Sequence, residues 1–138
     1  MIIECKKAIS DATGEDLGND SPWLKIGKQY VVYAIRFRND PPHFIRLEAL
    51  IESEHYGEPH LFDLTQFTVI SSKIPSTWIF NYDSEGSMVF MPSDWFYDSC
   101  WEDLGNETSR WLELFHKEKE LILQEEPEFY KNINNSNS

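Results

Sequence analysis

Strand-like segments fill the first two thirds of this 138-residue chain, and one helical pattern follows them. Up to residue 92, short segments rich in β-branched and aromatic residues alternate with turns that contain Gly, Pro, Asn or Asp. The clearest of these segments, residues 28–38, is followed by Asn39-Asp40-Pro41-Pro42, which ends a strand because proline donates no backbone hydrogen bond. Strands first and a helix last predict an α+β fold in which the helix covers a small sheet or barrel.

The expected strands span residues 2–9, 28–38, 43–52, 60–63, 67–71, 77–82 and 87–91. The last two flank Asp83-Ser84-Glu85-Gly86, and a four-residue turn that ends in glycine predicts a hairpin. A short helix is expected near 94–99. A longer helix is expected over 107–125, with Asn106 as its cap and Pro127 beyond its end.

The longer helix has an apolar side and a polar side. Its apolar residues recur with the 3.6-residue period of one buried face: Trp111, Leu114, Phe115, Leu121 and Ile122. On the polar side, Glu113 and Lys117 are expected to pair. We expect a single domain over 1–130, made of a barrel part (1–71), a hairpin (72–92) and a helical part (93–130), and a flexible tail over 131–138.

The chain is strongly acidic, with 24 acidic and 12 basic residues and a formal net charge of −12. Residues 94–128 hold 11 of the acids and three of the bases, so most of the negative charge lies in the C-terminal third. Nucleic acid is not an expected partner, because affinity for phosphates depends on Lys and Arg. An aromatic platform for single strands would also need a positive groove. An acidic surface favours a basic partner instead.

The expected compartment is the cytoplasm. The longest apolar runs hold about six residues, against the roughly 20 that a membrane span needs. A charge follows early at Glu4, so no signal peptide and no membrane association are expected. Cys5 and Cys100 do not form a CxxC motif, and without an export signal two reduced thiols are the expectation.

One part of the chain resembles small bacterial domains with an SH3-like, five-stranded β-barrel. In those domains a Leu-x-x-Gly-Lys-x-Tyr-x-Val strand follows a loop, and a Phe-x-Val-Ile strand closes the barrel. The matching residues are Leu24, Gly27, Lys28, Tyr30 and Val32, and later Phe67, Val69 and Ile70. The resemblance implies a small SH3-like antiparallel barrel, extended by a hairpin and covered by the C-terminal helix. Such barrels host many functions, so it says little about activity.

A second part resembles small bacterial proteins of polymorphic-toxin neighbourhoods, including immunity proteins of contact-dependent growth inhibition. It begins with Ile74-Pro75-Ser76-Thr77-Trp78 and continues through Trp95 and Cys100-Trp101-Glu102 into the terminal helix. The resemblance implies an immunity protein that neutralises a cognate toxin by covering its basic active-site cleft, the expected toxin being a nuclease. The alternative is a non-catalytic SH3-like module that binds a peptide or another protein through a sheet edge or groove.

The candidate toxin-binding residues combine acids with aromatic side chains. Interfaces favour aromatic centres, and surrounding acids attract a basic cleft. The first group contains Asp94, Trp95, Asp98, Trp101, Glu102 and Asp103, and the second contains Glu52, Glu54 and Glu58. Trp95 or Trp101 is the expected anchor. The alternative for this aromatic segment is a buried position between barrel and helix.

No pattern typical of an enzyme is present, and we expect neither activity nor cofactor. The metal-ligating side chains closest in sequence are His55, Glu58, His60 and Asp63. Gly57 and Pro59 mark a turn among them, so a polar hairpin tip is expected rather than a metal site. Cys100 lies between two acids, which would raise the pKa of its thiol and disfavour a nucleophile. Phosphate-binding glycine loops are absent from the sequence.

Overall fold

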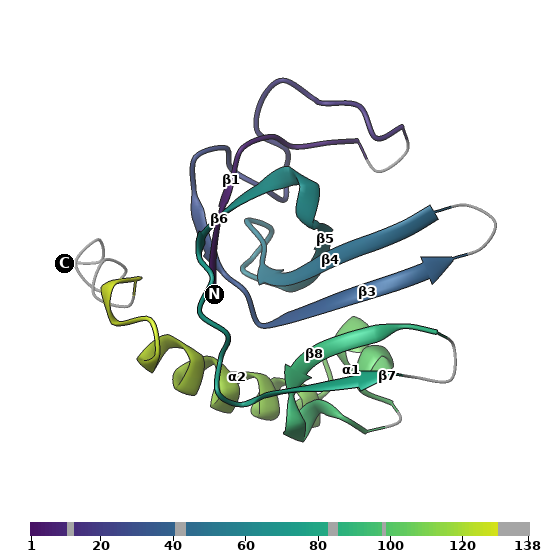
Figure 1. Ribbon diagram of the computed structural model, residues 1–138, viewed down its shortest axis with the longest axis vertical. Coiled ribbons are helices and arrows are strands. Elements are labelled where there is room, and N and C mark those ends of the chain that lie inside the picture. The colour runs from purple at the N-terminus through teal and green to yellow at the C-terminus, as the bar shows by residue number, and fades with distance from the viewer. Residues whose placement is uncertain (11–12, 41–43, 83–85, 98, 130–138) are drawn as a thin grey trace.

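The computed structural model describes residues 1–10, 13–40, 44–82, 86–97 and 99–129. Eight strands in this part of the chain form two antiparallel sheets, and two helices follow them (Figure 1). The expectation of an α+β fold that ends in a helix is therefore confirmed. Among the described helices, none is both long and apolar enough to cross a membrane.

The smaller sheet has three strands in the order β2–β1–β6. They are β1 (Ile2–Cys5), β2 (Gln29–Val31) and β6 (Phe67–Ser71). The central strand β1 is antiparallel to both neighbours, with Ile3 opposite Tyr30 on one side and Val69 on the other. A single 3₁₀ turn, Leu64–Gln66, leads into β6. The first strand is shorter than the expected 2–9, because the chain leaves the sheet after Cys5.

The larger sheet has five strands in the order β5–β4–β3–β8–β7. They are β3 (Ala34–Asp40), β4 (Phe44–Glu52), β5 (Pro59–Asp63), β7 (Trp78–Tyr82) and β8 (Met88–Pro92). The predicted hairpin over 72–92 is present as β7 and β8. Because β8 pairs with β3, this hairpin continues the same sheet.

The single strand expected over 28–38 is wrong, since the chain bends at Val32 and Tyr33. The N–H of Val32 donates to the carbonyl of Met1 in the smaller sheet (3.1 Å). The next N–H, of Tyr33, donates to Leu50 in the larger sheet (2.9 Å). Two successive residues thus bond to different sheets, which splits the segment into β2 and β3.

Two helices, α1 (Cys100–Asn106) and α2 (Ser109–Gln124), follow the last strand. The short helix expected near 94–99 is a 3₁₀ turn at Ser93–Trp95 instead, and α1 begins later. Thr108, rather than Asn106, caps α2, because its Oγ1 accepts a hydrogen bond from the N–H of Trp111 (3.3 Å).

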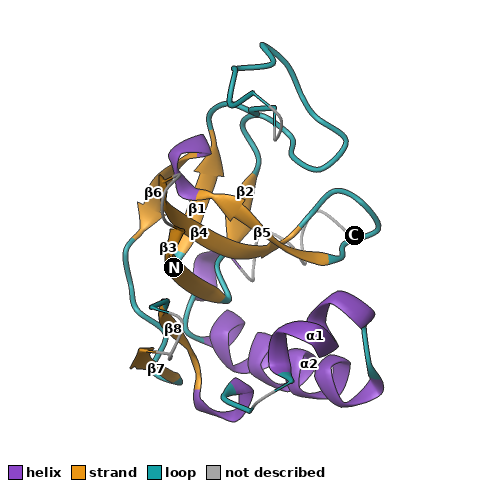
Figure 2. Ribbon diagram, turned by 90° about the vertical axis from the view of Figure 1, so that its right-hand side faces the viewer, coloured by secondary structure: helices purple, strands orange, loops and turns teal. Residues whose placement is uncertain are grey.

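The larger sheet is covered on both faces, by different layers. One face packs against the helices, which lie along one side of it (Figure 2). The core on that side includes Ala34, Leu50, Val89, Met91, Trp95, Trp111, Phe115 and Ile122. The opposite face packs against the smaller sheet through Ile3, Tyr30, Ala49, Ile51, Phe67 and Trp78. The apolar face predicted for the long helix is correct except at Leu121, which is exposed.

Candidate protein-binding surfaces

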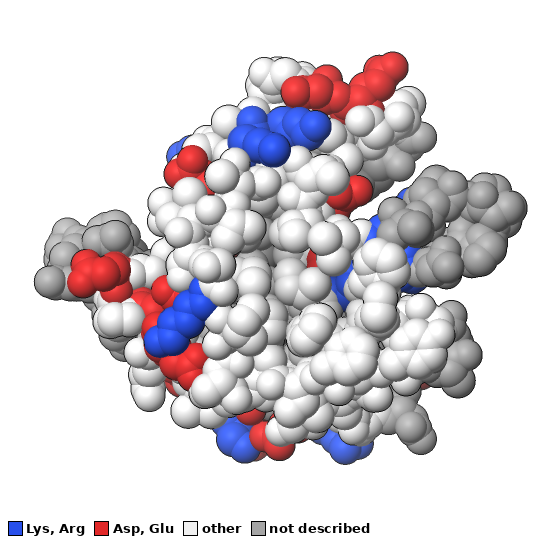
Figure 3. Space-filling model, in the orientation of Figure 1, with Lys and Arg blue, Asp and Glu red and all other residues white. Residues whose placement is uncertain are grey.

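Charge is distributed unevenly over the molecule. On the face shown in Figure 3, acids and bases lie mainly around the margin, and the centre is largely uncharged.

The expectation that Trp95 could anchor a partner is wrong. Its side chain is 0% exposed, and its ring packs edge-on against Trp111 with centroids 4.7 Å apart. The larger sheet on one side and α2 on the other enclose it. For Trp95 the alternative, a buried position between sheet and helix, is the one observed, whereas Phe96, Tyr97 and Trp101 are partly exposed. Asp98 lies outside the described residues.

Trp101, on α1, is half-buried and covered by an arginine. The guanidinium of Arg36 from β3 lies 4.8 Å from the centroid of the indole ring. Arg36 is itself held by two hydrogen bonds to Glu48 Oε1, at 3.1 and 3.2 Å. This stack joins α1 to the sheet, so a partner would have to displace Arg36 to reach that face of Trp101.

The acids of the first group differ in how far they are neutralised. Asp94 Oδ2 lies 2.7 Å from Lys117 Nζ, and this hydrogen-bonded lysine lowers the pKa of the Asp94 carboxyl. Lys117 therefore pairs with Asp94 and not with Glu113 as expected. Asp103, in the first turn of α1, accepts a hydrogen bond from Ser99 Oγ (3.4 Å). Glu102 is exposed, and the described residues offer it no ion-pair partner.

In the second group, Glu52 joins β4 to α2. It accepts a hydrogen bond from Tyr33 Oη (2.9 Å) and forms an ion pair with Lys119 Nζ (3.0 Å). Glu58 makes a weaker contact with His60, at 3.4 Å. These two acids already have partners within the chain.

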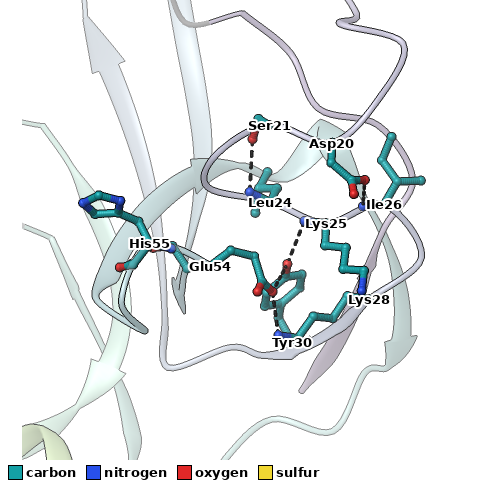
Figure 4. A network of polar contacts seen from close by, with 10 residues as sticks. Asp20, Ser21, Leu24, Lys25, Ile26, Lys28, Tyr30, Glu54 and His55 are labelled. Carbon is teal, nitrogen blue, oxygen red and sulfur yellow. Dashed lines mark hydrogen bonds and ion pairs between the residues drawn. The ribbon is translucent and has the colours of Figure 1, made fainter.

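Glu54 belongs to a network that fixes the long loop between β1 and β2 (Figure 4). The N–H of Lys25 donates to Tyr30 Oη (3.0 Å), whose hydroxyl donates to Glu54 Oε1 (2.9 Å). Lys28 Nζ lies 2.5 Å from the same oxygen. Burial by itself raises the pKa of Glu54, but the hydrogen bonds from Lys28 and Tyr30 outweigh it, and the pKa is lowered. The network holds Glu54 ionised in a structural role.

The two predicted groups do not form one surface. Lys117 binds Asp94 of the first group, and Lys119 binds Glu52 of the second. Residues two apart in a helix point about 200° apart around its axis. The groups therefore lie on different sides of α2, and one partner cleft would not cover both.

Four exposed glutamates on or next to the helices have no ion-pair partner within the described part of the chain. We call Glu102, Glu107, Glu113 and Glu120 the helical acidic surface; all four are exposed. The bases nearest in sequence are already engaged, Arg110 with the ring of Tyr97 (3.9 Å) and Lys117 and Lys119 with acids. Glu113 and Glu120 are seven residues apart and so share one side of α2. This spacing was the signal in the sequence that could have identified them. Arg110 and Lys117 follow the same spacing, and of these two bases only Lys117 is paired with an acid among the described residues, Asp94.

A small open cavity lies beside the loop between β1 and β2. Its volume is about 190 Å³, and its lining includes Ile9, Leu17, Trp23, Leu24, Phe62 and Gln66. Trp23 packs against His55 and His60, with ring centroids 4.6 and 5.5 Å apart. The two histidines thus contact an indole, and the described residues contain no group of three or more potential metal ligands.

The two thiols lie in different cores. Burial raises the pKa of Cys100 to about 12, and the nearby charge of Asp103 acts in the same direction. Burial also raises the pKa of Cys5. Because the thiolate is the reactive form, neither side chain is set up as a nucleophile.

Comparison with known proteins gives no match: no family model, no curated protein and no solved structure is similar to this chain. Function is therefore inferred from the surfaces themselves.

Proposed function

We propose that this protein is a non-catalytic inhibitor of a basic protein toxin, of the kind that the resemblance to immunity proteins implies. The observation that carries the proposal is the helical acidic surface, where four exposed glutamates have no ion-pair partner among the described residues. Most of the acids that the sequence indicated as toxin-binding residues have partners within the chain. We therefore assign toxin binding to the helical acidic surface instead. It would act in the cytoplasm, the compartment expected from the sequence.

Electrostatics explains how such a surface would work. Like charges that are not compensated nearby create a field that extends beyond the surface and accelerates encounter with a positive cleft. A nuclease cleft is positive because it binds phosphates. Glutamates at this surface would take the place of those phosphates and block access of nucleic acid to the toxin.

We also propose that the first 71 residues form an SH3-like barrel, and one strand pairing supports this. β6 carries Phe67, Val69 and Ile70, and it pairs with β1 at the opposite end of this part of the chain. That is the position expected of the strand that closes such a barrel. The bend at Val32 and Tyr33, which carries the chain from one sheet to the other, is consistent with a curved sheet.

Charge reversal tests the proposed surface. In the double variant Glu113→Lys and Glu120→Lys, association with a toxin domain encoded beside the gene should slow by about tenfold at low salt. The effect should shrink as salt screens the charges. The matched control is Glu4→Lys with Glu15→Lys, which changes the net charge equally outside the helices. Equal slowing in both double variants would show that only the net charge matters and would contradict a localised surface.

A second candidate function, peptide binding by an SH3-like module, is favoured by the cavity next to Trp23. The cavity is open and lined by both apolar and polar side chains, and the indole of Trp23 in its lining offers a flat surface to an extended peptide. Trp23→Ala separates the two functions. It should leave toxin association unchanged if the helices bind, and abolish binding if the cavity does.

A further inference from the structure

The outer strand of the larger sheet, β7 (Trp78–Tyr82), has an open edge. It pairs with β8 on one side, and within the described residues no strand pairs with its other side. Its sequence, Trp-Ile-Phe-Asn-Tyr, contains neither a charge nor a proline. Edge strands are usually protected by such residues, because unpaired backbone groups invite another strand.

The register shows which backbone groups face outward. Across the β7–β8 pair, the N–H of Ser93 donates to the carbonyl of Thr77 (3.2 Å). Next along the strand, Trp78 lies opposite Pro92, which has no N–H. The N–H of Trp78 itself donates to the carbonyl of Pro75 (3.1 Å), so at this residue only the carbonyl is open to a further strand. Because the direction of the backbone groups alternates along a strand, Phe80 turns its N–H and its carbonyl away from β8. Tyr82 faces the same way, and its N–H is bound only by the side chain of the adjacent Asn81 (2.9 Å).

Aromatic side chains beside this edge are exposed. Phe80 lies opposite Phe90 of β8, with ring centroids 5.2 Å apart, and their exposed fractions are 54% and 43%. Tyr82 is 64% exposed. These residues share a face of the sheet with Ala49 and Ile51, which the smaller sheet covers. The smaller sheet does not extend over the aromatic end, and Figure 3 shows a largely uncharged surface in the region of β6, β7 and β8.

The lack of charge on β7 and β8 indicates which kind of partner would pair with this edge. A basic partner would find no acid on β7 or β8, whose ten residues are all uncharged. Two copies of a chain with a net charge of −12 repel each other, and an uncharged face is where they can meet at least cost. The strand is also complementary to itself, because a two-fold axis through Phe80 pairs every residue of β7 with a residue of the second β7.

We propose that β7 pairs antiparallel with β7 of a second copy of this chain, joining two five-stranded sheets into one of ten strands. Phe80 faces Phe80 of the second copy, and the two exchange N–H to carbonyl hydrogen bonds. Tyr82 faces Trp78 of the second copy, and its N–H leaves Asn81 for the carbonyl of that tryptophan. The two pairs of Phe80 and Phe90 then form one aromatic cluster on the same face of the joined sheet.

The pairing leaves the helical acidic surface accessible. Figure 2 shows β7 and the helices on opposite sides of the lower part of the molecule. The contact is isologous and closes on itself, so it gives a dimer and not a filament.

Sedimentation velocity from about 1 μM to about 500 μM tests the proposal on the full chain. The wild-type protein should pass from monomer to dimer within this range. Phe80→Lys should raise the dissociation constant by at least about thirtyfold. The matched control is Ile79→Lys, which adds the same charge to the same strand, at an exposed residue whose backbone groups face β8. It should change the constant by less than about threefold.

Amide hydrogen exchange of the wild-type protein gives a readout that needs no variant. The N–H groups of Phe80 and Tyr82 should exchange more slowly as the protein concentration rises. A wild-type protein that stays monomeric, or a dimer that Phe80→Lys does not weaken, overturns the proposal. Protection of these amides by added toxin but not by concentration also overturns it, and would assign the edge to a strand of the toxin.

Discussion

Replacing Trp95 by alanine should remove a large part of the stability of this protein. The side chain is 0% exposed, and its ring lies 4.7 Å from that of Trp111 and 6.1 Å from that of Phe115. Truncating a buried tryptophan to alanine costs about 3–5 kcal/mol, and loss of the edge-on contact with Trp111 favours the upper half of that range. Domains are stable by only about 5–15 kcal/mol, so a loss of about 4–5 kcal/mol removes from about a quarter to all of the free energy of unfolding.

Urea unfolding followed by far-ultraviolet circular dichroism measures this loss without relying on tryptophan fluorescence. A cost of about 4 kcal/mol lowers the midpoint by about 2 M when the slope is about 2 kcal/mol per molar urea, and the slope should not change. The control is Trp23→Ala, which removes an indole that is 37% exposed and should cost less than about 1.5 kcal/mol. Similar costs for the two variants would refute the reasoning, because it depends on the different burial of the two rings.

Three further predictions concern titration and ion pairing. Glu118 on α2 is 3% exposed, and burial raises its pKa above the ordinary value of 4.5. The Glu118 carboxyl thus binds a proton more tightly in the folded state than in the unfolded state. The free energy of unfolding should therefore fall as the pH rises from 4.5 through the raised pKa. Urea midpoints measured over this pH range should fall less steeply for Glu118→Gln. Cys100, with a pKa of about 12, should react with a thiol reagent near neutral pH only after unfolding, and fast reaction of the native protein would contradict its burial. A double-mutant cycle on Glu52→Gln and Lys119→Met should give a coupling of about 0.5–1 kcal/mol in unfolding free energy, and zero coupling would mean that the pair does not tie β4 to α2.

The strands that sequence predicts well are those bounded by local turn signals. The expected strand over 67–71 is β6 as observed, and the expected 43–52 and 77–82 differ from β4 and β7 by one residue at the start. The segment over 28–38 fails for a physical reason. Its β-branched and aromatic composition is uniform, and its division depends on two hydrogen bonds to Met1 and Leu50, which lie far away in the sequence. Local composition cannot indicate which of two sheets a residue joins.

The candidate site was harder to predict because the sequence shows where the acids are but not which of them form ion pairs with lysines in the folded protein. Glu54 is paired with Lys28, Asp94 with Lys117, and Glu52 with a lysine 67 residues away. The acids around Trp95 in the sequence suggested an exposed anchor, with a buried position as the alternative, and tertiary packing encloses the ring. What the sequence did provide was the region of excess charge, since the four glutamates of the helical acidic surface lie within residues 94–128.

The charged residues are distributed so that the protein is strongly acidic while the edge strand β7 carries no charge. A net charge of −12 opposes self-association only where the charges lie near the contact, because screening limits their reach to about 10 Å at an ionic strength of about 0.1 M. With unpaired glutamates on the helices and none on β7 or β8, the proposed toxin-binding surface and the proposed dimer contact are separate. Higher salt should therefore weaken toxin binding and leave dimerisation unchanged or slightly stronger. If salt weakened both in parallel, the two surfaces would share charged residues, and this separation would be wrong.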